Sequence, residues 1–229
     1  MPRFGAGRVG DVVAAGRYAI HHAGAPCGEE RWRVEVGADG LIVTAEQEHV
    51  APHPFPNRQA WRATFTDAWR PTGLEVAWTV GARALRARHA RDGARWRARI
   101  EYQGAVREQE GDFPEACEVE FTSPLFVSAM LARRAFAPGG EHEFPVLRIG
   151  PPWMAVEPER MRIVCVERGE HGAPWGRVPA QRYVVSLADR ADGAAYGLWA
   201  DADDLVLETF EGPDPGPTWM RLVEYRAAG

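Results

Sequence analysis

Apolar and polar residues alternate along much of the first half of the chain. Within 31–36, every second residue is apolar and the intervening residues are Arg31, Arg33 and Glu35. The same period of two runs through four further segments, 61–65, 74–80, 85–89 and 95–102. Alternate side chains of a strand point to opposite faces, so each segment has one Trp-rich apolar face and one Arg-rich face. Strands of parallel sheets, which are covered on both faces, have continuous apolar runs instead. The pattern therefore predicts an antiparallel sheet.

Turn residues separate these segments, for example Asp39 with Gly40 and Asp92 with Gly93. Gly and Asp tolerate the positive φ angles of tight hairpins. Strands joined by such short turns are neighbours in a sheet, which predicts an up-and-down meander. The second half of the chain alternates more weakly and is expected to contain five strands, at 161–168, 181–187, 194–200, 205–210 and 219–225. The segments 169–179 and 212–217 are interpreted as surface connections.

One segment departs from the period of two and predicts a helix over about 123–136. Ser123 can cap the first free N–H, and Pro124 suits the first helical position. Pro138 and the two glycines after it end the segment. Apolar side chains cover most of the helix circumference, so the helix is expected to be buried. The predicted fold is mainly β, a curved antiparallel meander sheet (a half-barrel or open barrel) wrapped around one short buried helix.

Length and composition are consistent with a single β domain over residues 1–229, with residues 1–16 as a flexible N-terminal segment. The net charge of −5 argues against a nucleic-acid partner, which requires a basic face. Every basic residue is Arg, so lysine chemistry is excluded. The three cysteines form no CxxC pair and are expected to be reduced. No signal peptide and no bilayer-length apolar run is recognised, so a cytoplasmic protein that does not span a membrane is expected.

Four segments, at 16–20, 28–32, 69–71 and 122–125, carry a family resemblance. With the expected architecture, they resemble the glycolipid-binding family of the LolA-like half-barrel superfamily. The resemblance implies an open, incomplete barrel that cradles lipid or acyl chains. The carrier members are exported, whereas no signal peptide is recognised here, so the resemblance implies an intracellular lipid-like ligand. It supplies no catalytic residues.

Large apolar side chains are the candidate ligand-binding residues. Four tryptophans share the apolar face of the predicted strands, and the predicted helix adds three apolar side chains and two arginines that could pair with an anionic headgroup. The candidates are Trp32, Trp61, Trp78, Trp96, Phe126, Met130, Leu131, Arg133 and Arg134. The alternative interpretation of the tryptophans is ordinary core packing.

We therefore expect non-catalytic binding or carriage of a hydrophobic or amphipathic ligand, a lipid or glycolipid. One alternative is a small-molecule hydrolase or isomerase that uses His21 or His22 with Glu29 or Glu30. Another is an assembly protein with a filled core, for example a homodimer. No HExxH, Cys/His cluster or GxSxG motif is present, so neither a metal nor another cofactor is expected. Glu118, with Glu120, is interpreted as part of a solvated face that pairs with Arg.

Overall fold

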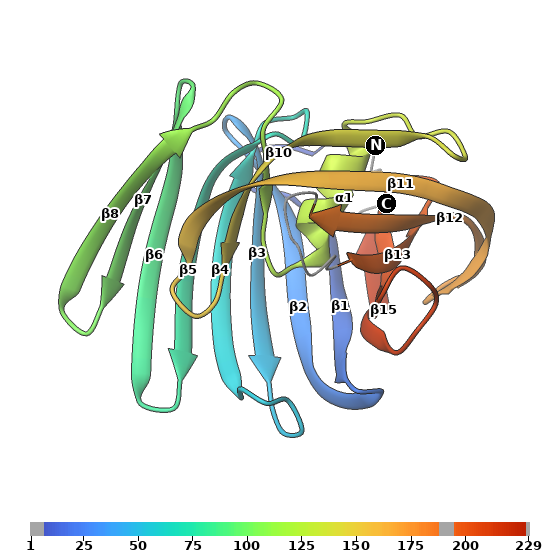
Figure 1. The fold of residues 1–229 in the computed structure, drawn as a ribbon, viewed down its shortest axis with the longest axis horizontal. Coiled ribbons are helices and arrows are strands. Elements are labelled where there is room, and N and C mark those ends of the chain that lie inside the picture. The colour runs from blue at the N-terminus through green and yellow to red at the C-terminus, as the bar shows by residue number, and fades with distance from the viewer. Residues whose placement is uncertain (1–6, 188–194, 228–229) are drawn as a thin grey trace.

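The computed structural model describes residues 7–187 and 195–227. Within these ranges, fifteen strands form one continuous sheet, and one short helix, α1 (Pro124–Ala132), accompanies it (Figure 1). All hydrogen-bonded neighbours in the sheet are antiparallel, except that β9 runs parallel to β10. The prediction of a mainly β, antiparallel fold with a single short helix is confirmed.

The first half of the chain forms eight strands that pair in sequence order, as the meander predicts. These strands are β1 (Val12–His22), β2 (Ala25–Gly37), β3 (Gly40–His49), β4 (Asn57–Phe65), β5 (Pro71–Val80), β6 (Arg83–Asp92), β7 (Arg95–Tyr102) and β8 (Ala105–Asp112). The alternation in the sequence corresponds to alternating burial, and in β7 every second residue from Trp96 to Ile100 is buried.

The second half forms seven strands, which also pair in sequence order. These strands are β9 (Glu118–Glu120), β10 (Glu141–Gly150), β11 (Ala155–Ala173), β12 (Gly176–Leu187), β13 (Ala195–Asp201), β14 (Val206–Glu211) and β15 (Thr218–Ala227). The first strand joins the two halves, because β1 pairs with β15 and places Tyr18 opposite Leu222. The edge strands β8 and β9 do not pair with each other, so the sheet remains open.

The helix lies between the two halves of the sheet. In Figure 1 the strands β10 to β13 run across the direction of β1 to β6, with α1 among them. Phe126 packs against Trp61 and Phe65 of β4, with ring centroids 5.6 and 5.5 Å apart. On its other side, the Ser128 Oγ accepts a hydrogen bond from the Val206 N–H of β14 at 3.0 Å. The helix is buried on all sides, as its apolar circumference predicts.

Two predicted boundaries need correction. The helix begins as predicted, with Ser123 as its N-cap, but it ends at Ala132 rather than near residue 136. Arg133 is its C-cap, and the side chains of Arg133 and Arg134 bind the buried Glu118. Of the segment 1–16, expected to be flexible, residues 1–6 lie outside the described residues, and β1 begins at Val12, where the side chain of Val13 is buried.

Other elements were not predicted correctly from the sequence. The segment 169–179, interpreted as a surface connection, extends the antiparallel β11–β12 hairpin, in which Ala173 pairs with Gly176. The strands β3, β8, β9 and β10 were not predicted. In β3 the buried row contains Gln47, which breaks the apolar period, whereas β8 is largely exposed on both faces and has no apolar row.

Candidate functional site

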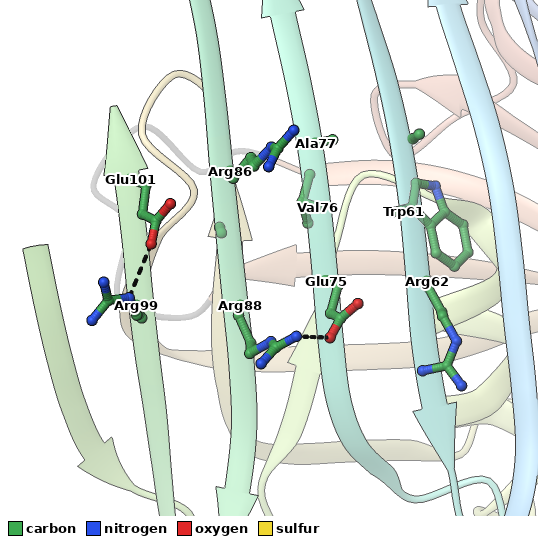
Figure 2. Close-up of a pocket in the computed structure, with 11 residues that line it drawn as sticks. Trp61, Arg62, Glu75, Val76, Ala77, Arg86, Arg88, Arg99 and Glu101 are labelled. Carbon is green, nitrogen blue, oxygen red and sulfur yellow. Dashed lines mark hydrogen bonds and ion pairs between the residues drawn. The ribbon is translucent and has the colours of Figure 1, made fainter. Parts of the chain in front are cut away.

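A shallow groove on the outer surface is the first hollow of interest. It has a volume of about 600 Å³ and lies over β4 to β7, where Ala60 and Ala77 lie opposite each other. Charged side chains also line the groove, among them Arg62, Glu75, Arg86, Arg88, Arg99 and Glu101 (Figure 2). Arg88 pairs with Glu75 at 2.9 Å, and Arg99 with Glu101 at 3.0 Å. These side chains are exposed, so the groove is a solvated, ion-paired surface rather than an apolar site.

A second hollow lies at the beginning of α1, and we call it the helix-start cavity. Its volume is about 540 Å³. Its walls come from the approach to α1, the first turn of α1, and the strands β10 to β15. Apolar side chains dominate these walls: Phe121, Pro124, Val127, Ile149, Pro151, Val185, Leu187, Ala195, Tyr196, Trp219 and Met220. This composition and volume are typical of sites for small apolar molecules.

Polar side chains also line the helix-start cavity: Glu120, Thr122, Ser123, Arg148, Glu157, Ser186, Thr209 and Glu211. Thr122 and Ser123 lie where the chain enters α1. Arg148 and Glu157, from neighbouring strands, form an ion pair at 2.5 Å. Trp219 also lines the cavity and its side chain packs edge-to-face against Tyr196, although Trp219 remains 45% exposed. The cavity therefore joins an apolar interior to polar and aromatic groups in contact with solvent.

A buried polar row lies directly behind Ser123. The Ser123 Oγ donates to the Glu30 Oε1 at 2.7 Å, and the Gln47 Nε2 donates to the Glu30 Oε2 at 3.2 Å. The Gln59 Nε2 continues the row by donating to the Gln47 Oε1 and to the Thr122 Oγ1. Burial raises the pKa of Glu30 to about 8, although the Ser123 hydrogen bond opposes this rise. Glu30 is thus chiefly protonated at neutral pH.

The predicted ligand-binding residues occupy the core rather than the helix-start cavity. Trp32, Trp61 and Trp96 are buried, and Trp61 packs between Phe121 and Phe126. Trp78 is partly buried and donates a hydrogen bond to the Asn57 Oδ1 at 3.1 Å. None of the nine predicted residues lines the cavity. Ligand contact by the tryptophans stays a prediction.

The five predicted residues at the helix also lie outside the helix-start cavity. Phe126, Met130 and Leu131 are buried beneath the sheet. Arg133 and Arg134 both form ion pairs with Glu118 at 2.7 Å. Glu118 is buried, which corrects its interpretation as part of a solvated face. The structure therefore brings the two predicted arginines together, but at the end of α1 opposite the helix-start cavity.

The residues considered for an enzyme are not assembled as one site. Glu30 points into the core toward Ser123, whereas Glu29 forms ion pairs with Arg17 and Arg31. His21 lies opposite Pro26 in the hairpin, at a different level from either glutamate. The described part of the chain holds no group of three or more His, Cys, Asp or Glu side chains placed to bind a metal ion.

One histidine–carboxylate pair was missed from the sequence. The His171 Nε2 lies 2.8 Å from the Glu208 Oε2, and the imidazole stacks on Trp199. Burial would raise the pKa of Glu208, but hydrogen bonds from His171, Thr218 and Arg221 lower it to about 2. A carboxylate held so firmly by three donors is a weak base, so this pair serves to connect strands.

The cavity residues were also missed, and β14, which supplies Thr209 and Glu211, shows one reason. Five consecutive residues of β14, Val206 to Phe210, are all buried. A strand that is covered on both faces gives no period of two, so its sequence does not show which side chains face a cavity. Trp219, two residues after Pro217, was the available signal.

Comparisons with known proteins support the fold. No family model and no curated protein matches the sequence. Among solved structures, the chain is similar to a beta-barrel-like protein of the domain of unknown function DUF1849 from Brucella abortus. The TM-score is 0.61 and the identity 6%, covering 98% of this chain and 100% of that chain. It is also similar to a DUF1089 family protein from Pseudomonas aeruginosa, with a TM-score of 0.54 and 13% identity, covering 81% of this chain and 90% of that chain.

No helix within residues 7–187 and 195–227 has the length and apolar content needed to cross a bilayer.

Proposed function

We propose that this protein binds a hydrophobic or amphipathic small molecule, of the lipid or glycolipid class, in the helix-start cavity without transforming it. The observation that carries this proposal is the apolar lining of a hollow of about 540 Å³ between α1 and the second half of the sheet. Small-molecule sites commonly enclose about 300–1,000 Å³ behind mostly apolar walls.

The distribution of polar groups favours an amphipathic ligand. Val127, Val185 and Ile149 are buried and supply apolar contacts for a hydrocarbon tail. Each buried methylene contributes about 0.8 kcal/mol to transfer from water. Arg148 and Glu157 are partly exposed and supply hydrogen-bonding groups for a polar headgroup. The ligand thus lies with its tail among the valines and its headgroup near this ion pair.

The glycolipid class rests on the sequence resemblance to the half-barrel superfamily. The two similar solved structures support the same architecture and carry no ligand assignment of their own. An open sheet with an internal helix supplies a concavity. In this protein the apolar end of that concavity lies at the beginning of α1.

The decisive experiment begins with the protein purified from its own host. Native mass spectrometry followed by denaturing extraction is expected to reveal a stoichiometric lipid-like mass. The variant Ala195→Trp places an indole in the helix-start cavity and should abolish this mass. The matched control Ala77→Trp places the same side chain in the outer groove, and this variant should keep the co-purified lipid-like mass. Ligand-free protein that also ignores a panel of fatty acids and glycolipids would contradict the proposal.

A further inference from the structure

Four arginines gather at the end of α1 opposite the helix-start cavity, and we call them the four-arginine cluster. Arg133 and Arg134 follow the last residue of α1, Arg70 ends the turn between β4 and β5, and Arg91 lies near the end of β6. The turn before Glu118 links the two pairs: the Pro114 carbonyl accepts from the Arg70 Nη2 at 3.2 Å and from the N–H of Cys117, the neighbour of Glu118, at 3.0 Å. The charges of Arg70 and Arg91 also act on Arg133.

The cluster has more positive charge than its acidic neighbours balance. Glu118 lies at its centre, bonded to the Nη1 atoms of Arg133 and Arg134. A second carboxylate, Glu115, is 4.0 Å from the Arg70 Nη1, but its side chain is 95% exposed and strongly screened by solvent. Of the four guanidinium groups, only those of Arg133 and Arg134 contact a buried carboxylate.

This positive charge is also poorly hydrated. The side chains of Arg70 and Arg134 are 13% exposed and that of Arg133 is 19% exposed. Burial, together with the charges of neighbouring arginines, lowers the pKa of Arg133, although Glu118 opposes this. Packing several like charges out of water is unfavourable unless another charge compensates them.

The arginines are held in place and retain unused donors. The Arg70 and Arg91 guanidinium carbons lie 5.7 and 5.6 Å from the centroid of the buried Phe113 ring. Arg134 lies 3.8 Å over the Phe144 ring. Within the described ranges, the buried Arg70 Nε has no hydrogen-bond partner. Such cation–π contacts fix the guanidinium planes before a ligand arrives.

We propose that the four-arginine cluster binds a phosphate group, either inorganic phosphate or a phosphomonoester. A phosphate dianion supplies the missing negative charge, and its oxygens match the planar fork of several guanidinium groups at once. The Arg70 Nη2 donates to the Pro114 carbonyl, the Arg91 Nε to the Gly93 carbonyl and the Arg133 Nη1 to Glu118, so each approaches the oxygens with its remaining N–H groups. Glu118 keeps Arg133 and Arg134 side by side. This site is independent of the helix-start cavity.

Isothermal titration calorimetry with inorganic phosphate tests the proposal directly. The full-length protein is titrated at constant ionic strength, and saturable binding of one phosphate per chain is expected. The variant Arg91→Gln removes a partly buried charge at the cluster and should weaken binding about ten-fold or more. The control Arg86→Gln removes an exposed charge from the outer groove and should change the affinity less than about two-fold.

Three results would overturn the proposal. The first is no saturable heat in the unmodified protein, which does not depend on the folding of any variant. The second is an unchanged affinity in a folded Arg91→Gln variant. The third is an equal loss in both variants, because that would mean general charge screening.

The source of the phosphate is resolved by comparing glycerol 3-phosphate with a single-chain lysophosphatidate. Equal affinities would identify a soluble phosphomonoester, and tighter binding of the acylated molecule would identify a lipid headgroup. Ala195→Trp should leave inorganic phosphate binding intact, because the helix-start cavity lies at the other end of α1. Calorimetry with phosphate therefore tests the four-arginine cluster alone, and native mass spectrometry of the co-purified ligand tests the helix-start cavity alone.

Discussion

Ser123 and Glu30 are 93 positions apart in the chain, yet the Ser123 hydroxyl donates to the Glu30 carboxyl at 2.7 Å inside the core. The same hydroxyl accepts from the Leu125 N–H at 3.3 Å and so caps α1. One small side chain therefore starts the helix and connects it to β2. This link fixes the end of α1 that borders the helix-start cavity.

The variant Ser123→Ala should lose both hydrogen bonds and leave Glu30 less well satisfied. Loss of a helix cap and of a buried hydrogen bond together should lower the free energy of unfolding by about 1–3 kcal/mol. Urea denaturation at pH 7 measures the change. Ser186→Ala, at a partly buried strand position, serves as the control and should stay within about 0.5 kcal/mol.

Glu30 should make the protein less stable as the pH rises. Burial raises its pKa from 4.5 to about 8, so between these values the folded state holds a proton that the unfolded state releases. Stability from this group is complete below about pH 4.5 and is lost as the pH rises to 8, at about 1.4 kcal/mol for each unit of pKa difference. Glu30→Gln mimics the protonated form and should remove this slope. A pH series of urea midpoints tests this, and an unchanged slope would contradict it.

His89 should make the protein less stable as the pH falls, the opposite of the effect of Glu30. It is buried beside Trp96, whose Nε1 lies 3.4 Å from the His89 Nδ1, and burial lowers its pKa from 6.5 to about 4. As the pH falls, His89 is protonated near pH 6.5 in the unfolded state but only near pH 4 in the folded state. The free energy of unfolding therefore decreases as the pH drops from about 6.5 to 4. His89→Gln should flatten this acid limb when thermal midpoints are compared at pH 7 and pH 4.5. Protonation of Glu30 stabilises the folded protein over part of the same pH range. The effect of His89 is therefore measured in the Glu30→Gln background, with and without His89→Gln.

The period of two in the sequence was sufficient for much of the fold. Strands such as β2 and β7 have one solvent-exposed and one buried face, so polar and apolar residues alternate in their sequences. The pattern fails where burial is the same on both faces: β14 is buried on both and β8 is largely exposed on both. The N-cap of α1 was predicted correctly because capping is a local interaction.

The candidate sites depend on contacts between distant segments. The cavity wall places Val127 of α1 with Val185 of β12 and Trp219 of β15, and no local pattern reveals that contact. The tryptophans that the alternation identified lie in the core, because in-phase apolar residues fill the interior whether or not a cavity lies nearby. Arg133 and Arg134 were predicted as ligand-binding residues from the sequence. Arg70, in the turn between β4 and β5, and Arg91, near the end of β6, come close to them only in the folded chain.

Gly197 should be intolerant of even a methyl group. A Cβ built at this position would lie 2.0 Å from the Cε2 of Phe210, the residue opposite it on β14. Gly197→Ala must displace that buried ring, and overpacking of this kind lowers stability by about 1–3 kcal/mol. Gly111→Ala in β8 is the matched control, because a Cβ there meets nothing within 4 Å. Thermal unfolding of the two variants compares them, and equal midpoints would contradict the prediction.

Glu118→Gln should reveal how strongly the four-arginine cluster depends on its one buried carboxylate. The substitution keeps the shape but leaves Arg133 and Arg134 without their anion, and breaking a buried ion pair on one side lowers stability by about 3–5 kcal/mol. If the cluster binds phosphate, the added positive charge should strengthen that binding. Millimolar phosphate should then raise the melting temperature of the variant more than that of the unmodified protein. Equal shifts in both, at matched ionic strength, would mean that phosphate acts only as a general salt and that the arginines serve packing alone.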